Sequence, residues 1–361
     1  MIDAIENSKE SFEDDFLKVQ LERQGDLEPR ELWGPYLRAP TLYFEIVEHP
    51  LMTDLGNISR TRIGLQTFAD KFYILSKETA QTWGIEKRYL KKIITSPRLV
   101  SKTSIDPDQV NEFVLVCSDK AEDLQGRNIQ KFIEWGEELE VEVRKKETKV
   151  KGFHQLPRVQ IAKRKPWYNL QKEIDAKGIA PILYPYMAWK RIIFVWNPEG
   201  VIDHQNFVGI IPKKNELILP LLAVLNSSLT EFVVRCISHI YGGGVAKLRP
   251  SDIRGLRILD IEKIKSNERE HLSKLFLNLV KDNENSQKAL DDVVFNLLKL
   301  NEKKRAKIMQ TIEELKRVQQ IRKEVNVLVE TAEKWKPRKK PRREKLSKVE
   351  PSKRLDTWMR Q

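Results

Sequence analysis

Residues 221–236, LLAVLNSSLTEFVVRC, form an almost unbroken apolar stretch. This pattern predicts that residues 217–239 form one buried helix that anchors a core. Residues 241–258, YGGGVAKLRPSDIRGLRI, come shortly after it and combine three glycines with basic side chains. One interpretation is a core helix followed by an ordinary hairpin. The other is the frame of a site that grips a polyanion, because glycine lets backbone N–H groups approach a phosphate closely.

The bulk composition is that of a globular protein with many exposed charges. The chain has 361 residues, of which 40% are apolar and 32% charged. This length suggests about two or three domains. The sequence has no apolar run of about 18 residues, which a membrane-spanning helix needs. Its acidic beginning, MIDAIENSKESFEDDF, lacks the apolar centre of a signal peptide. We therefore expect a cytoplasmic protein without a membrane partner.

The net charge of +13 is unevenly distributed along the chain. Residues 1–31 carry ten acidic and four basic side chains, whereas residues 144–172 carry ten basic and one acidic. Residues 334–361 carry twelve basic and three acidic. Blocks of like charge repel one another unless an anionic partner neutralises them, so nucleic acid is the favoured partner. A solvated basic loop and tail is the alternative interpretation.

The sequence offers no recognisable catalytic motif. Cys117 and Cys236 stand in apolar contexts and read as reduced core residues, and the five histidines lack metal-ligand spacing. Methylation of an exocyclic base amine needs a tetrad of the N-P-P-Y kind, and residues 197–200, NPEG, read instead as a turn. We find no cofactor-binding glycine loop, nuclease cluster or nucleophile–histidine set. We therefore expect no catalytic centre, no metal and no cofactor in this chain.

The hydrophobic pattern predicts an α+β fold with a mixed sheet, followed by a helical region. Strands are expected at residues 58–63, 71–76, 112–118, 191–197 and 207–212. Helices are expected at residues 89–97, 128–139, 267–282, 286–300 and 301–335. Asn301 can cap the last helix, whose narrow apolar stripe fits either an internal helical hairpin or a coiled coil with a partner. Residues 336–361 are too charged and too rich in proline to fold alone.

Several segments resemble, in order, the C-terminal target-recognition part of adenine-specific DNA methyltransferases of restriction–modification systems, the TaqI-like specificity domain. The similar segments are LWGPYLRAP (32–40), LGNISRTRIGLQTFADKFYIL (55–75), KPWYNLQ (165–171), PILYPYMAWKRIIFVWNPEGVIDHQNFVGIIP (181–212), LAVLNSSL (222–229), GGGVAKLRPSDIRGLRI (242–258) and LDDVVFNLLKLNEKKRAKI (290–308).

The resemblance covers roughly residues 30–320 and implies a division of the chain into four parts. These are an acidic N-terminal segment (1–31), a DNA target-recognition domain (32–260), a helical region (261–335) and a disordered basic tail (336–361). The family carries its catalytic domain upstream, and here only about 30 residues precede the first similar segment. The resemblance therefore implies a split system or a truncated gene, in which S-adenosylmethionine binds a separate methyltransferase subunit.

The resemblance also implies that loops read the major groove of double-stranded DNA while basic side chains hold its backbone. The phosphate-contacting candidates are Arg62, Lys71, Lys163, Arg164, Lys165, Lys190, Lys213, Lys214, Lys247 and Arg249. The base-reading candidates are Gln66, Arg158, His204, Gln205 and Asn206. Each basic candidate is otherwise a solvated surface charge, and His204 and Asn206 are otherwise turn residues. Trp167 and Tyr168 follow a basic run and could stack on a base, but they read as core residues.

Two other functions remain open at this point. A degenerate restriction endonuclease would cut DNA in a metal-dependent reaction. A helical interaction module would bind a protein through residues 301–335 and RNA through the basic blocks.

Overall fold

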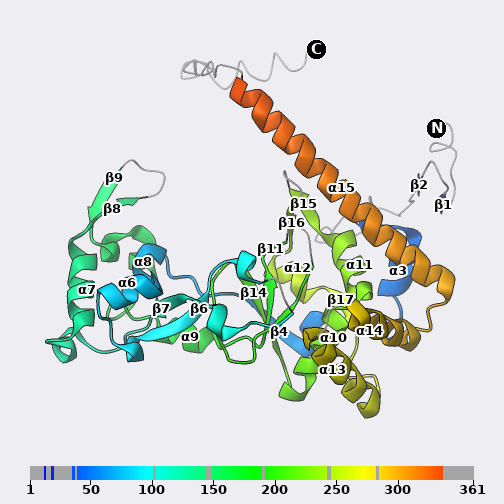
Figure 1. Ribbon diagram of the computed structural model, residues 1–361, viewed down its shortest axis with the longest axis horizontal. Helices are drawn as coiled ribbons and strands as arrows, with labels where there is room; N and C mark the ends of the chain where they lie inside the picture. Colours follow the sequence, from blue (N-terminus) through cyan, green and yellow to red (C-terminus); the bar gives the residue numbers. More distant parts are fainter. Residues whose placement is uncertain are drawn as a thin grey trace, which may run out of the picture.

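The computed structural model describes residues 12–13, 18–19, 35–36, 39–100, 103–143, 148–188, 192–241, 245–281 and 284–335. Figure 1 shows two lobes that meet at a central sheet containing β14 and β4. Helices and both parallel and antiparallel strand pairs occur, which confirms the predicted α+β class. The basic tail at 336–361 and most of the acidic segment at 1–31 lie outside the described residues; strands β1 (Phe12–Glu13) and β2 (Lys18–Val19) belong to the acidic segment.

The central sheet has the strand order β12-β10-β14-β4 and is antiparallel throughout. Its strands are β12 (Val195–Trp196), β10 (Ile182–Pro185), β14 (Phe207–Pro212) and β4 (Ser59–Ile63). The prediction of strands near residues 58–63 and 207–212 is confirmed. The strand expected at 191–197 is shorter than predicted, because only Val195 and Trp196 pair with β10.

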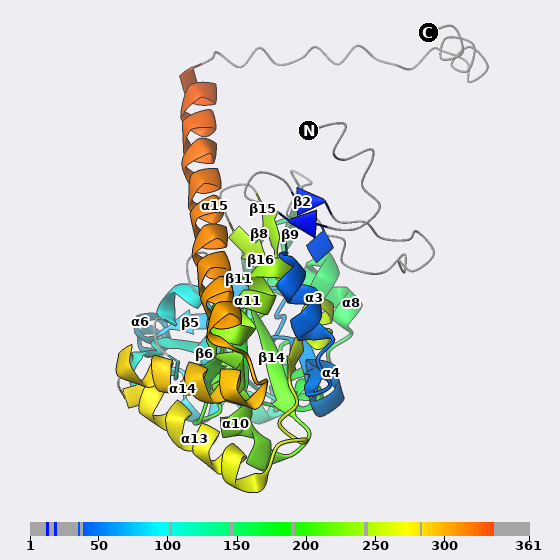
Figure 2. The same ribbon diagram turned by 90° about the vertical axis from the view of Figure 1, so that its right-hand side faces the viewer.

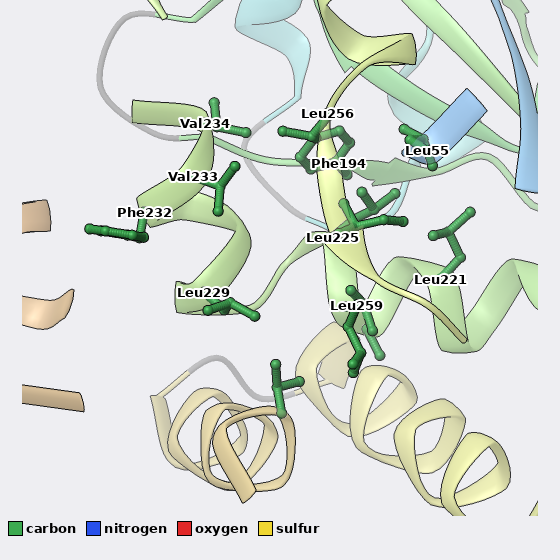
Figure 3. Close-up of a cluster of buried hydrophobic side chains, with 14 of the residues drawn as sticks. Leu55, Phe194, Leu221, Leu225, Leu229, Phe232, Val233, Val234, Leu256 and Leu259 are labelled. Carbon is green, nitrogen blue, oxygen red and sulfur yellow. The ribbon is translucent and has the colours of Figure 1, made fainter. Parts of the chain in front are cut away.

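The apolar stretch that opened the analysis forms two helices, so the prediction of one continuous helix is wrong. Helices α10 (Ile218–Leu225) and α11 (Ser228–Ile237) meet at an angle of 74°. Helix α10 ends before Asn226, whose side chain accepts a hydrogen bond from the N–H of Phe194 and donates one to its carbonyl. The hydroxyl of Ser227 then caps α11. Both helices are nonetheless buried in one core; Figure 3 shows Leu221, Leu225 and Leu229 within it, while the ring of Phe232 points away from them.

The C-terminal helices pack on this same core. They are α13 (Ser266–Lys281), α14 (Glu284–Leu297) and α15 (Glu302–Trp335), and Asn301 accepts a hydrogen bond from the backbone N–H of Lys304, as the capping prediction requires. Ile308 and Ile312 of α15 are buried, whereas Val318, Ile321 and Val325 are exposed. Figure 2 shows α15 extending far beyond the helices on which its first turns pack. Internal packing, one of the two alternatives left open for this stripe, is thus seen at Ile308 and Ile312, and the coiled coil with a partner stays a prediction for the exposed part of the stripe.

Smaller elements complete this lobe. Helix α3 (Thr41–Val47) packs beside α11, and β3 (Met52–Asp54) pairs with β17 (Arg257–Leu259). Helices α4 (Leu55–Ile58) and α12 (Pro250–Arg254) lie next to β4. Strands β15 (His239–Tyr241) and β16 (Val245–Lys247) form the predicted hairpin, and β11 (Met187–Ala188) adds to it. The three glycines between β15 and β16 lie outside the described residues.

The second lobe is built on the sheet β13-β6-β7-β5. Its strands are β13 (Ile202–Asp203), β6 (Leu90–Ile94), β7 (Glu112–Leu115) and β5 (Ile74–Ser76). The helix predicted at 89–97 is therefore wrong, because Leu90–Ile94 pairs with strands on both sides. The strand predicted at 71–76 is half right, since helix α5 (Asp70–Tyr73) occupies its beginning.

Helices cover the sheet of the second lobe. They are α6 (Lys77–Thr82), α7 (Asn128–Glu138), α8 (Pro157–Ala162) and α9 (Gln171–Lys177), and the strands β8 (Glu140–Val143) and β9 (Thr148–Lys151) form a hairpin. The ring of Trp167 packs at a tilt against Phe72, with ring centres 4.6 Å apart, and Tyr168 is 3% exposed, so their predicted core role is confirmed. Cys117 and Cys236 are both buried thiols, also as predicted.

The helices after residue 260 share a core with residues before it. The domain limits given above, 32–260 and 261–335, stay a prediction, because a shared core alone does not define where one domain ends and the next begins. No single helix among the described residues is long and apolar enough to cross a membrane; the bent pair Asn215–Leu225 and Ser228–Ile237 passes by length and composition alone.

Candidate nucleic-acid interface

The two lobes meet where the loop after β4 pairs with the turn before β14. Leu65 and His204 form a parallel bridge, in which the N–H of Leu65 donates to the carbonyl of Asp203 at 2.6 Å and the N–H of Gln205 donates to the carbonyl of Leu65 at 2.9 Å. A side chain on Gly64 would place its Cβ 2.1 Å from the His204 carbonyl oxygen. Glycine is therefore required at this close approach.

Three of the predicted base readers are brought together by this bridge. The Nε2 of Gln66 donates to the Oε1 of Gln205 at 3.3 Å. The exposed Asn206 follows Gln205, and its Nδ2 donates to the carbonyl of Thr95 at 2.9 Å. We call Gln66, Gln205 and Asn206 the amide patch. Its side chains carry both donors and acceptors, as base-edge recognition requires.

Basic side chains are connected to the amide patch through neighbouring residues. The N–H of Tyr186 donates to the carbonyl of Asn206 at 2.8 Å, and the Nζ of Lys247 lies 4.9 Å from the centre of the Tyr186 ring. On the other side, Lys163 and Lys165 flank Arg164, whose guanidinium donates to the carbonyl of Gln66. Lys163 and Lys165 are exposed.

Lys71, Arg158, Lys163 and Lys165 form no ion pair with any of the residues that the structure describes. Lys71 lies on α5, close in sequence to Gln66, and Arg158 is exposed on α8. Exposed lysines without a carboxylate partner, here Lys71, Lys163 and Lys165, are suited to hold a phosphate backbone, whereas the guanidinium of Arg158 can also donate to a base edge.

Arg62 belongs to the fold and not to a free surface. Its guanidinium makes two hydrogen bonds to Asp203, at 2.7 and 2.8 Å, and three of its nitrogens also donate to backbone carbonyls, those of Ile63, Lys177 and Gly178. The side chains of Arg62 and Asp203 are 11% and 1% exposed. Arg62 is therefore not available for the phosphate contact that we expected. Its buried ion pair and backbone hydrogen bonds join β4, β13 and the end of α9.

Arg164 is also bound within the protein. Its side chain is 2% exposed, pairs with Glu173, and donates to the carbonyl of Thr67 at 2.8 Å and to the Tyr73 hydroxyl at 3.2 Å. Burial raises the pKa of Tyr73 to about 12, so this hydroxyl stays neutral at ordinary pH. Arg164 is therefore not available for the phosphate contact that we expected. It holds the loop that carries Gln66 instead.

His204 lies beneath the amide patch and does not reach its surface. The ring is buried, and neither ring nitrogen has a hydrogen-bond partner among the described residues. Its Nε2 is 3.4 Å from a carboxylate oxygen of Asp70. A buried ring cannot reach a base edge, so we no longer count His204 among the base readers.

The remaining candidates lie elsewhere. Lys213 and Lys214 stand just beyond the far end of β14 from Phe207, and the ends of a six-residue strand are roughly 17 Å apart. Lys213 donates to the carbonyl of Asn57 and Lys214 pairs with Glu262.

Arg249 is 57% exposed and pairs with Asp252 at the start of α12. Lys190 lies outside the described residues.

Two exposed apolar side chains beside the basic candidates were missed by sequence reasoning. Phe68 is 36% exposed next to the amide patch, and Ile161 is 77% exposed on α8 between Arg158 and Lys163. A signal for Ile161 is its place inside the basic block, where an apolar side chain has no periodic partner. Phe68 gives no such signal, because QTFADKFYIL reads as continuous core sequence.

No group of three or more His, Cys, Asp or Glu side chains that could hold a metal ion occurs in the described part of the chain. The lobe junction presents the hydrogen-bonding amides of Gln66, Gln205 and Asn206.

Comparison with known proteins identifies the family. The model of the type II methyltransferase M.Eco57I, C-terminal domain, matches residues 38–298. The chain belongs to this family. The coarser part of the resemblance, to the C-terminal part of DNA methyltransferases of restriction–modification systems, is thereby confirmed. The finer similarity to a TaqI-like specificity domain stays a prediction.

One curated relative and two solved structures are similar to this chain. The type II methyltransferase M.AccI of Acinetobacter calcoaceticus is 25% identical over 271 residues, which are 72% of this chain and 46% of the relative. The type IIG restriction endonuclease BpuSI has a similar fold, with a TM-score of 0.52 at 13% identity over 81% of this chain and 34% of that one. The type IIL enzyme MmeI, solved in complex with DNA, aligns at a TM-score of 0.44, too low to bear on the fold. The chain spans less than half the length of the curated relative that it matches.

Proposed function

We propose that this chain recognises a specific sequence in double-stranded DNA for a restriction–modification methyltransferase. The observation that carries the proposal is the amide patch at the lobe junction, with the exposed Lys163 and Lys165 on either side of Arg164, which bonds Gln66, in a chain of the M.Eco57I C-terminal family. Amides can read base edges in the major groove, and cations hold the phosphates that set their register. Gln66, Gln205, Asn206 and Arg158 are the proposed base readers.

The catalytic step belongs, in this proposal, to another chain. A separate methyltransferase subunit binds S-adenosylmethionine and methylates the N6 amine of an adenine that this chain has located. The family membership supports a role in DNA methylation. The adenine specificity, the separate subunit and a cytoplasmic location extend the same proposal beyond that support.

Replacing Gln205 tests the proposed role of the amide patch. Gln205→Leu keeps the approximate size of the side chain but removes its donor and acceptor. We expect the variant to lose about 1–3 kcal/mol of preference for the selected DNA site over scrambled duplex, with unchanged affinity for the scrambled duplex. Fluorescence anisotropy with both duplexes measures this difference.

Gln109→Leu is the matched control, because Gln109 is exposed and, among the described residues, its side-chain amide bonds only Asp106. Equal loss of preference in both variants, or none in Gln205→Leu, contradicts the proposed readers.

The proposal further expects the purified chain to bind duplex DNA without methylating it, and methyl transfer to begin when a methyltransferase chain with an N-P-P-Y tetrad is added. Methyl transfer by the purified chain alone would show that catalysis resides here.

A further inference from the structure

Phe68 is held at the protein surface in an unusual backbone conformation. Its φ of 64° lies in the left-handed region, which is costly for a bulky residue. Its neighbours Thr67 and Ala69 are buried, at 0% and 5% exposure, whereas the Phe68 side chain is 36% exposed. The loop therefore turns this ring towards solvent while burying the residues on both sides.

Specific contacts fix this conformation. The hydroxyl of Thr67 accepts a hydrogen bond from the N–H of Ala69 at 3.2 Å and donates to the carboxylate of Asp70. Arg164 donates to the carbonyl of Thr67 at 2.8 Å, and its guanidinium carbon lies 5.5 Å from the centre of the Phe68 ring. These contacts fix the position of the Phe68 ring before any partner binds, as a preorganised binding residue requires.

The side-chain amide of Gln66, two residues before Phe68, has a donor and an acceptor that are not used within the described residues. One N–H of Gln66 is used by Gln205. Its second N–H and its Oε1 have no partner among the residues that the structure describes. A donor and an acceptor side by side on one amide match the N7 acceptor and the N6 donor of adenine.

The chemistry of Phe68 matches the other half of the same base pair. In the major groove, the thymine opposite an adenine presents a C5 methyl group, with which a phenylalanine ring makes an apolar contact. We propose that the Gln66–Gln205 pair and Phe68 together read one adenine–thymine pair, with the ring against the thymine methyl group. This inference rests on the proposed function, since it assumes that the amide patch meets the major groove.

Replacing thymine by uracil tests the methyl contact directly, because uracil lacks only that group. Duplexes are first selected by the full chain from a pool of random sequence. Each thymine of the selected site is then replaced singly by uracil. One replacement should weaken binding of the parent chain about fourfold, the factor expected for one buried methyl group. Phe68→Ala should bind the thymine and uracil duplexes equally, at the weaker affinity.

Two further variants keep the test independent of folding. Phe68→Gly should also lose the distinction between thymine and uracil, yet unfold thermally no earlier than the parent, because glycine accepts a positive φ without strain. Ile179→Ala should retain the distinction. Ile179 is 42% exposed and follows Gly178, which neighbours Ile211 at the other end of β14 from Phe207.

The failure of this inference differs from the failure of the proposed function. A parent chain that selects a site but tolerates uracil at every position overturns the methyl contact alone. Retained thymine preference in Phe68→Ala and Phe68→Gly also overturns it. A parent chain that selects no sequence overturns the proposed function, and this inference with it.

Discussion

Arg62 and Asp203 form a buried ion pair that joins the two lobes. Breaking such a pair leaves one charge buried without compensation, which costs about 3–5 kcal/mol. We therefore expect Arg62→Ala and Asp203→Ala each to lower the free energy of unfolding by about this amount, measured by urea denaturation. Lys213→Ala is the control, since Lys213 is exposed and surface substitutions usually change stability by less than about 0.5 kcal/mol. A loss in Arg62→Ala no greater than in Lys213→Ala would show that the pair is dispensable.

Arg62 and Arg164 also show where sequence reasoning about single residues stops. Both stand in basic or polar stretches that read as exposed, yet their partners Asp203 and Glu173 lie 141 and 9 residues away. Exposure depends on which carboxylate the fold places beside each guanidinium, and periodicity does not reveal that. The neighbours of Arg164, Lys163 and Lys165, are exposed as expected.

Asp291 joins α14 to the beginning of α11. Its carboxylate accepts hydrogen bonds from the N–H and the hydroxyl of Ser228, both at 2.6 Å. Burial raises the pKa of Asp291 above its ordinary 3.8, although the bonds from Ser228 and Gln287 act in the opposite direction. The folded chain therefore holds this proton to a higher pH than the unfolded chain does.

The contribution of Asp291 to stability should accordingly be greatest below pH 3.8 and should fall as the pH rises through the raised pKa. Asp291→Asn removes the titration but keeps an oxygen for the Ser228 N–H and an N–H for its hydroxyl. We expect this variant to show a flatter dependence of the unfolding free energy on pH across that window. Identical pH profiles for the variant and the parent would contradict the assignment.

Elements were predictable where one pattern was sufficient. Strands near 58–63 and 207–212 and the C-terminal helices show clear periodicity and appear in the structure. LKKII at 90–94 is too short to distinguish helix from strand by periodicity, and its strand form depends on pairing with β7 and β13, which are distant in sequence. The break between α10 and α11 was signalled by Asn226 and Ser227, a helix-capping sequence, although the apolar residues around them dominated the pattern.

Two hairpins that belong to basic stretches of the sequence lie on one side of the molecule. In both views the β8–β9 and β15–β16 hairpins lie at the upper side, opposite α10 and α13 (Figures 1 and 2). The basic block at 144–172 includes β9 and α8, and the basic sequence at 241–258 includes β16. The sequence shows these two basic stretches far apart along the chain. Their common side depends on how the fold places the two hairpins, which the sequence pattern does not reveal.

The basic tail should add attraction that is blind to sequence. Residues 336–361 are rich in lysine and arginine, which attract any phosphate backbone whatever its sequence. Deleting them should weaken binding to selected and scrambled duplexes by the same factor and should lower the salt dependence. A tail of equal length with Lys and Arg replaced by Gln is the control and should behave like the deletion. Loss of preference for the selected duplex alone would make the tail a reader.

The central claim is that this chain chooses a sequence in duplex DNA. Selection from a random duplex pool, followed by affinity measurement between about 50 and 200 mM salt, tests it most directly. We predict one enriched sequence, affinity that falls about 10³–10⁵-fold over that range if six to ten phosphates are held, and weaker binding to single-stranded RNA. No enriched sequence, or equal affinity for duplex DNA and single-stranded RNA, would contradict the account.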